Sequence, residues 1–179
     1  MPEINWIIHI VANGMRCEDC GKIENPFPQY ICNAHTHGME RYGHQDFQLV
    51  IHMAPQDMGY VLNTLGLRVR AGKRFKAGDL VEGIFLDCPV RLDEFEETGR
   101  KVLRVIIPDA ANRFPEDPEC TYPYNYQLIP TDELVQKAGC VSSGVLCHRS
   151  PEDPAEAPYS AFPRRYRRLY HRCSAPSER

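Results

Sequence analysis

One long helical segment stands among several short runs of β-branched and aromatic residues, and this contrast limits what the chain can fold into. The helical segment covers residues 55–71, with Pro55 suited to the first turn and Gly72 to the end. Its apolar residues recur at helical spacing: Met58, Val61, Leu62, Leu65 and Val69. These features predict one principal amphipathic helix.

The short apolar runs are bounded by turn residues, which is typical of strands. They cover residues 4–11, 29–34, 47–53, 80–86, 89–95 and 101–108. Gly99 suits a hairpin turn between the last two runs, and residues 131–138 form a short second helical pattern. Because long helices do not separate the runs, we expect an α+β fold with a mainly antiparallel sheet, one principal helix and a zinc-knuckle-like turn near the N-terminus.

Charge and composition divide the chain near Pro151. Residues 1–150 are acidic overall and long enough for one globular domain with its own core. Residues 151–179 comprise a Pro-rich linker and an arginine-rich tail, and we expect this segment to be disordered. The arginines and tyrosines of Arg164–Arg172 raise the alternative that the tail associates with nucleic acid.

The N-terminal residues have no pattern typical of a signal peptide, and no apolar run has the length of a membrane span. We therefore expect a cytoplasmic protein. In that reducing compartment the eight cysteines are better candidates for metal binding or burial than for disulfides.

Two pairs of soft ligands lie close together in residues 15–38, MRCEDCGKIENPFPQYICNAHTHG. Cys17 and Cys20 are two residues apart, and the same gap separates Cys32 from His35. This spacing lets two tight turns each offer two atoms to a tetrahedral zinc ion. We expect a structural zinc site formed by Cys17, Cys20, Cys32 and His35, with burial of Cys32 in a strand as the plainer alternative.

The neighbouring histidines leave two further alternatives open. His37 would share a strand face with His35 and could replace it as the fourth ligand. A catalytic zinc would instead use His35, His37 and His44, with Glu40 or Asp46 as the base, although the helix motif of zinc proteases is absent. The candidate catalytic residues are therefore His37, His44 and Glu40.

Three blocks in the middle of the chain resemble a known family. They are NAHTHGMERYGHQDFQLVI, LNTLGLRVRAGKRFKAGDLVEGIF and GRKVLRVIIPDAANRFPEDPEC. Together they resemble, over about residues 30–128, a largely bacterial family catalogued as domain of unknown function 4262. The resemblance implies no activity, and Gly43 and His44 are its more general features.

A basic cluster follows the principal helix and comprises Arg68, Arg70, Lys73, Arg74 and Lys76. Cations at a helix C-terminus stabilise the helix dipole, which accounts for much of this pattern. The functional alternative is a site for a phosphate or carboxylate.

Three functions follow from these patterns. The first choice is a zinc-stabilised binding or accessory protein with an unknown small-molecule or protein ligand. The alternatives are a metal- or histidine-dependent hydrolase that acts on an anionic substrate, and nucleic-acid association through the tail.

Overall fold

The computed structural model describes residues 4–16, 23–24 and 26–140. Within these residues the fold is α+β, with a six-stranded sheet, a principal helix α1 (Pro55–Arg70) and a shorter helix α2 (Thr131–Cys140). The predicted fold class is confirmed. The zinc-knuckle-like turn stays a prediction, because Cys17 and Cys20 lie outside the described residues.

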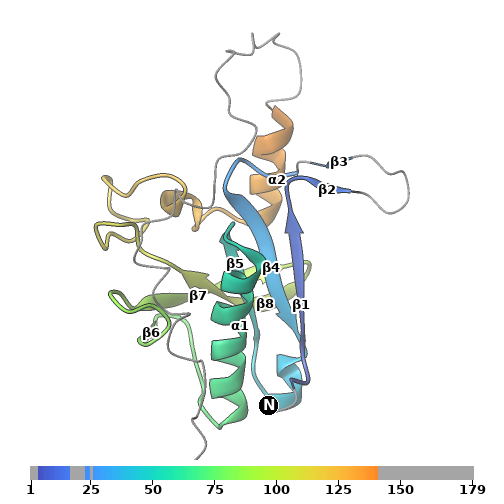
Figure 1. The fold of residues 1–179 in the computed structure, drawn as a ribbon, viewed down its shortest axis with the longest axis vertical. Coiled ribbons are helices and arrows are strands. Elements are labelled where there is room, and N and C mark those ends of the chain that lie inside the picture. The colour runs from blue at the N-terminus through green and yellow to red at the C-terminus, as the bar shows by residue number, and fades with distance from the viewer. Residues whose placement is uncertain (1–3, 17–22, 25, 141–179) are drawn as a thin grey trace, which may run out of the picture.

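The six strands lie in the order β1-β4-β5-β8-β7-β6. Their bounds are β1 Ile7–Ala12, β4 Ile31–His37, β5 Asp46–Ile51, β6 Leu80–Val81, β7 Val90–Glu97 and β8 Arg100–Ile106. All neighbours are antiparallel except β5 and β8, which are parallel. A small ribbon of β2 (Met15–Arg16) and β3 (Ile23–Glu24) projects beside the sheet, and two 3-10 helices, η1 (Met39–Tyr42) and η2 (Tyr124–Tyr126), lie in the connections (Figure 1).

Helix α1 lies against one face of the sheet and closes the apolar core (Figure 1). Its fully buried side chains are the apolar residues that recur at helical spacing in the sequence, together with Gly66. A Cβ atom at Gly66 would lie 2.6 Å from the ring of Trp6, so the absence of a side chain there lets the indole pack against the helix. The same ring donates a hydrogen bond from Nε1 to Asn63 (3.0 Å).

The strand predicted over residues 80–86 is shorter in the structure and ends at Val81. Gly83 has a φ of 72°, which does not continue a strand. The Arg68 guanidinium donates to the carbonyl oxygens of Glu82 (2.8 Å) and Gly83 (3.1 Å), so a side chain of α1 satisfies this backbone in place of a partner strand.

The face of the sheet opposite α1 carries a buried polar network. Arg104 is fully buried and donates to Gln48, to Thr131 and to the carbonyl oxygens of Gln127 and Ile129. Its guanidinium also stacks 3.7 Å from the centre of the Phe95 ring. Burial lowers the pKa of Arg104 to about 10, which leaves it charged at neutral pH. The network ties the segment before α2 to the middle of the sheet.

No helix in the described part of the chain has the length and apolar character needed to cross a membrane.

Candidate metal centre

Three histidines converge where β1 and β4 pair at the edge of the sheet. The antiparallel register places His9 directly opposite His35. His37 lies two residues further along β4, and alternate residues of a strand share one face. The three imidazoles therefore project from the same face of the sheet, on the side away from α1.

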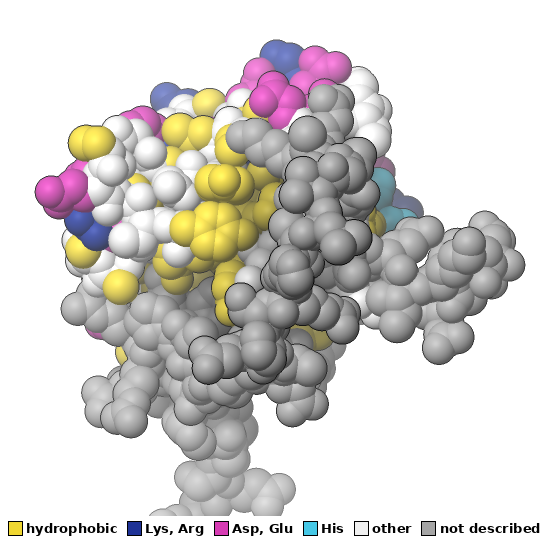
Figure 2. All heavy atoms as spheres, turned by 90° about the horizontal axis from the view of Figure 1, so that it is seen from above, with side chains coloured by type: hydrophobic (Ala, Val, Ile, Leu, Met, Phe, Trp, Pro, Cys, Tyr) yellow, Lys and Arg dark blue, Asp and Glu magenta, His cyan; other side chains and the backbone are white. Residues whose placement is uncertain are grey.

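The ring nitrogens are close enough for shared coordination. Nε2 of His35 lies 3.0 Å from Nε2 of His37, and one ligand atom from each of the three histidines lies within 4.8 Å of the others. Two imidazole nitrogens bound to one tetrahedral zinc are about 3.3 Å apart. His35 and His37 are thus nearly at coordination distance, and the exposed His9 needs only a small side-chain adjustment. Figure 2 shows histidine side chains gathered at the surface on one side of the molecule.

Asn33 orients the central histidine. Its Nδ2 donates to a carboxylate oxygen of Glu97 (2.7 Å), so its Oδ1 is the atom that faces Nδ1 of His35 (3.1 Å). Nδ1 must therefore carry the proton, which leaves the Nε2 lone pair directed toward His37. An outer hydrogen bond of this kind is the usual support of a metal-binding histidine.

The surroundings favour neutral imidazoles. Burial lowers the pKa of His35 to about 4, and the nearby His37 and Arg100 act in the same direction. Burial and Arg100 also lower the pKa of His37. At neutral pH both rings can therefore offer lone pairs without first losing a proton.

Cys32 lies on the other face of β4 from His35. Its Sγ contacts Sδ of Met58 in α1 (3.7 Å) and the carbonyl oxygen of Leu49, and burial raises the pKa of the thiol to about 12. In the structure, Cys32 and His35 therefore project from opposite faces of β4. The complete four-ligand set stays a prediction because Cys17 and Cys20 lie outside the described residues.

His44 is held apart from the other histidines. Its Nδ1 is 2.7 Å from the carbonyl oxygen of Gln45, and its Nε2 accepts a hydrogen bond from the backbone N–H of Phe75 (3.1 Å). The ring packs against Phe47 and Phe75. Both nitrogens are engaged, and this geometry supports a structural role for His44 in holding the loop after α1.

The two predicted carboxylates differ in their availability. Asp46 accepts hydrogen bonds from Thr36 and from the backbone of Met39, and it pairs with Arg100. Glu40 is exposed on η1, and its charge acts on His37. Of these two acids, Glu40 is therefore the one that remains available near the histidines.

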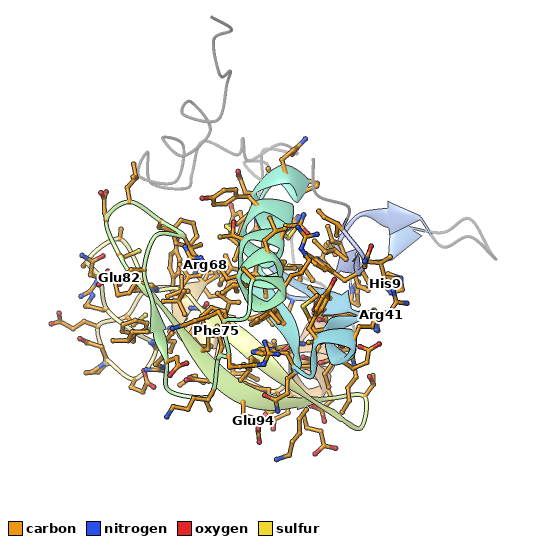
Figure 3. The ribbon with its side chains drawn as sticks, turned by 90° about the horizontal axis from the view of Figure 1, so that it is seen from below. His9, Arg41, Arg68, Phe75, Glu82 and Glu94 are labelled. Atoms are coloured by element: carbon orange, nitrogen blue, oxygen red, sulfur yellow. The ribbon has the colours of Figure 1, made fainter. Side chains whose placement is uncertain are left out.

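Arg68, the first residue of the basic cluster, lies well apart from His9, toward Glu82 (Figure 3). Arg68 and Lys73 border a cavity of about 520 Å³, but Asp79 and Glu82 border it too. Arg74 donates to the carbonyl oxygens of Val69 and Lys73, as a helix cap would. Anion binding by this cluster, including Arg70 and Lys76, stays a prediction, and the tail with Arg164–Arg172 lies outside the described residues.

His9 is the member of this cluster that was not predicted from the sequence. The strand predicted over residues 4–11 corresponds to β1, which begins later, at Ile7, and the alternation IIHIV places His9 on one face of it. The alternation does not give the pairing register between β1 and β4, and it is this register that sets His9 opposite His35. Register depends on the intervening turn and on the packing of both strands, not on the local pattern alone.

Comparison with known proteins identifies a family but no activity. No curated protein matches the chain, and no solved structure matches it. Residues 9–121 match the family described as Domain of unknown function (DUF4262), so the match begins at β1, earlier than the expected start near residue 30. Because it covers more than half of the sequence, the chain belongs to the DUF4262 family.

Proposed function

We propose that this protein is a metal-dependent hydrolase in which His9, His35 and His37 bind zinc. The observation that carries the proposal is the convergence of three histidines from two paired strands, with their ligand atoms within 4.8 Å. Three nitrogen ligands are typical of catalytic zinc sites, whereas structural sites have four protein ligands.

The surroundings of the histidines support an open coordination position. His35 is the most enclosed member and is oriented by Asn33, while His9 is exposed at the edge of the sheet. A metal bound by these three nitrogens would therefore face solvent on the His9 side. A zinc ion in such a site lowers the pKa of a bound water to about 7, which supplies a nucleophile at neutral pH.

Glu40 is the candidate general base. It is the exposed carboxylate of η1 next to the strand that carries His37, and no ion pair engages it among the described residues. Its position allows it to accept a proton from a water near His37.

The metal site is tested by elemental analysis of the full-length protein, purified without a metal-affinity tag. We expect one zinc per chain in the native protein and loss of zinc in His35→Ala. The matched control is His52→Ala, which removes a partly buried histidine outside the cluster and should retain zinc.

The same analysis separates the two ligand sets. Zinc retained in Cys17→Ser/Cys20→Ser supports the histidine centre. Zinc lost in that variant but retained in His9→Ala would instead support the cysteine-containing site and contradict this proposal.

Hydrolysis is tested with p-nitrophenyl acetate as a generic ester. We expect zinc-dependent turnover whose kcat falls about 100-fold or more in Glu40→Gln while zinc content is unchanged. Glu133→Gln, an exposed acid on α2, serves as the control. Turnover that is equal with and without zinc would exclude the metal-dependent reaction.

A further inference from the structure

A groove of about 620 Å³ lies on the same face of the sheet as the three histidines. The β7–β8 hairpin, β1 and the start of α2 all contribute to its walls. Its apolar lining includes Phe27, Phe95 and the exposed Val11 and Val135. The exposed valines, the buried Phe27 and the half-buried Phe95 provide a surface for an apolar ligand body.

The groove shares a wall with the metal centre. Val11 and Asn33 form a cross-strand pair that lines the groove, and the pair His9 and His35 is two residues further along the same strands. Two residues along a strand span about 6.7 Å. Asn33 also contacts Nδ1 of His35, so a ligand in the groove lies within one side chain of the proposed zinc.

Within the described part of the chain, the charged groups that line the groove are acidic: Glu96, Glu97 and Asp132. Glu97 is only 7% exposed and accepts hydrogen bonds from Asn33 and Gln48, yet no described residue forms an ion pair with it. A buried carboxylate without a direct counter-charge is costly. Arg104 attracts Glu97 at longer range, but its donors are used by Gln48, Thr131 and two backbone carbonyls.

We propose that this groove binds an organic cation with an apolar body, such as a substituted ammonium compound, and directs its other end toward the histidine centre. The apolar walls would hold the body, and Glu97 with the two rim carboxylates would supply the counter-charge. The second half of this inference rests on the proposed function. Among the described residues no lysine or arginine lines the groove, which favours a cationic ligand over the anionic substrate of the hydrolase alternative.

The test is a titration of the full-length, zinc-loaded protein with benzyltrimethylammonium. This probe has no free lone pair and cannot bind zinc, so its binding reports on the groove. The control is benzyl alcohol, a neutral molecule of similar size, because a carboxylate such as phenylacetate could bind the zinc directly. We expect the cation to bind about 10-fold or more tightly than benzyl alcohol and to shift the NMR signals of the Asn33 side-chain amide.

Two double variants locate the binding. Glu96→Gln/Asp132→Asn removes the exposed rim charges and should weaken cation binding about 2- to 10-fold. Glu82→Gln/Glu133→Gln removes two exposed charges that do not line the groove and should leave the affinity unchanged. Benzyl alcohol binding as tightly as the cation, no saturable cation binding, or equal cation affinity in both double variants would each overturn the inference.

Failure of this inference is distinguishable from failure of the metal proposal. Zinc content is measured on the samples used for titration. Zinc present without cation binding overturns the groove inference alone. Cation binding that persists in a zinc-free His9→Ala protein supports cation binding by the groove. The zinc proposal is then tested separately, by the elemental analysis of the native protein.

Discussion

On the α1 face of the sheet, β4 contributes Cys32 and Ala34 to the apolar core, whereas on the opposite face it contributes Asn33, His35 and His37. The first face is held by apolar burial under one helix. The second is held by hydrogen bonds among buried polar side chains around Arg104. Adjacent residues of one strand thus serve two purposes, because a strand sends successive side chains to opposite faces. The difference indicates that the apolar core and the candidate chemistry lie on opposite faces of the sheet.

The largest expected effect comes from breaking the polar network. Arg104→Met conserves much of the side-chain volume but removes the hydrogen bonds that Arg104 donates to Gln48, to Thr131 and to two backbone carbonyls. We expect a loss of about 3–5 kcal/mol in the free energy of unfolding, measured by urea denaturation. Arg41→Met, which removes one exposed hydrogen bond to Asn5, should cost less than about 1 kcal/mol. Equal costs would refute the importance of the network.

The next largest effect concerns the loop that follows β8. Burial acts to raise the pKa of Asp109, but hydrogen bonds from Arg113 and from the backbone of Thr121 and Ala111 outweigh it and lower the pKa to about 2. Because the folded-state pKa lies below the ordinary value, this stabilisation is present above about pH 4 and is lost as the pH falls toward 2.

We therefore expect Asp109→Asn to be about 2 kcal/mol less stable than the native protein at pH 7. As the pH falls from 4 to 2, the variant should lose less of its free energy of unfolding than the native protein does. Asp117→Asn is the control, because the Asp117 carboxylate accepts one exposed backbone hydrogen bond, from Glu119. Identical acid profiles for the native protein and Asp109→Asn would contradict the assignment.

The apolar face is tested by a matched pair of glycines in α1. Gly66→Ala places a methyl group 2.6 Å from the Trp6 ring and should cost about 1–3 kcal/mol. Gly59→Ala adds the same group in the same helix with no atom within 4 Å, and should stabilise the protein by about 0.5–1 kcal/mol. Thermal unfolding of both variants distinguishes the effect of the Trp6 contact from the effect of helix propensity. If both substitutions stabilised the protein, or both destabilised it, the importance of the Trp6 contact would be refuted.

The smallest effect on stability is expected at the histidine centre itself. His9→Ala removes an exposed ring and should change the stability of the zinc-free protein by no more than about 0.5 kcal/mol. It should, however, abolish the rise in melting temperature that zinc produces in the native protein, since binding to the folded state stabilises it. A zinc-dependent rise of the same size in His9→Ala would show that this histidine is not a ligand.

The elements of the apolar face could be predicted because their signals are local. The spacing of Met58, Val61 and Leu65 predicts the helix, and the observed bounds Pro55–Arg70 agree with it. The second helix, Thr131–Cys140, follows in the same way from its own pattern.

The candidate site could be predicted only in part, because it depends on which strands pair and in which register. The shared face of His35 and His37 follows from their spacing, but the opposition of His9 and His35 is a contact between distant segments. His44 carries the same chemistry in the sequence, yet its ring nitrogens contact Gln45 and Phe75. Residue type alone does not distinguish a ligand from a histidine that satisfies the backbone.

The most direct test of the central claim is X-ray absorption spectroscopy at the zinc edge of the full-length, zinc-loaded protein. The histidine centre predicts a first shell of nitrogen and oxygen atoms at about 2.0 Å, with the outer-shell scattering of imidazole rings. Sulfur atoms at about 2.3 Å would show that cysteines hold the metal, and would contradict the assignment of His9, His35 and His37 as its ligands.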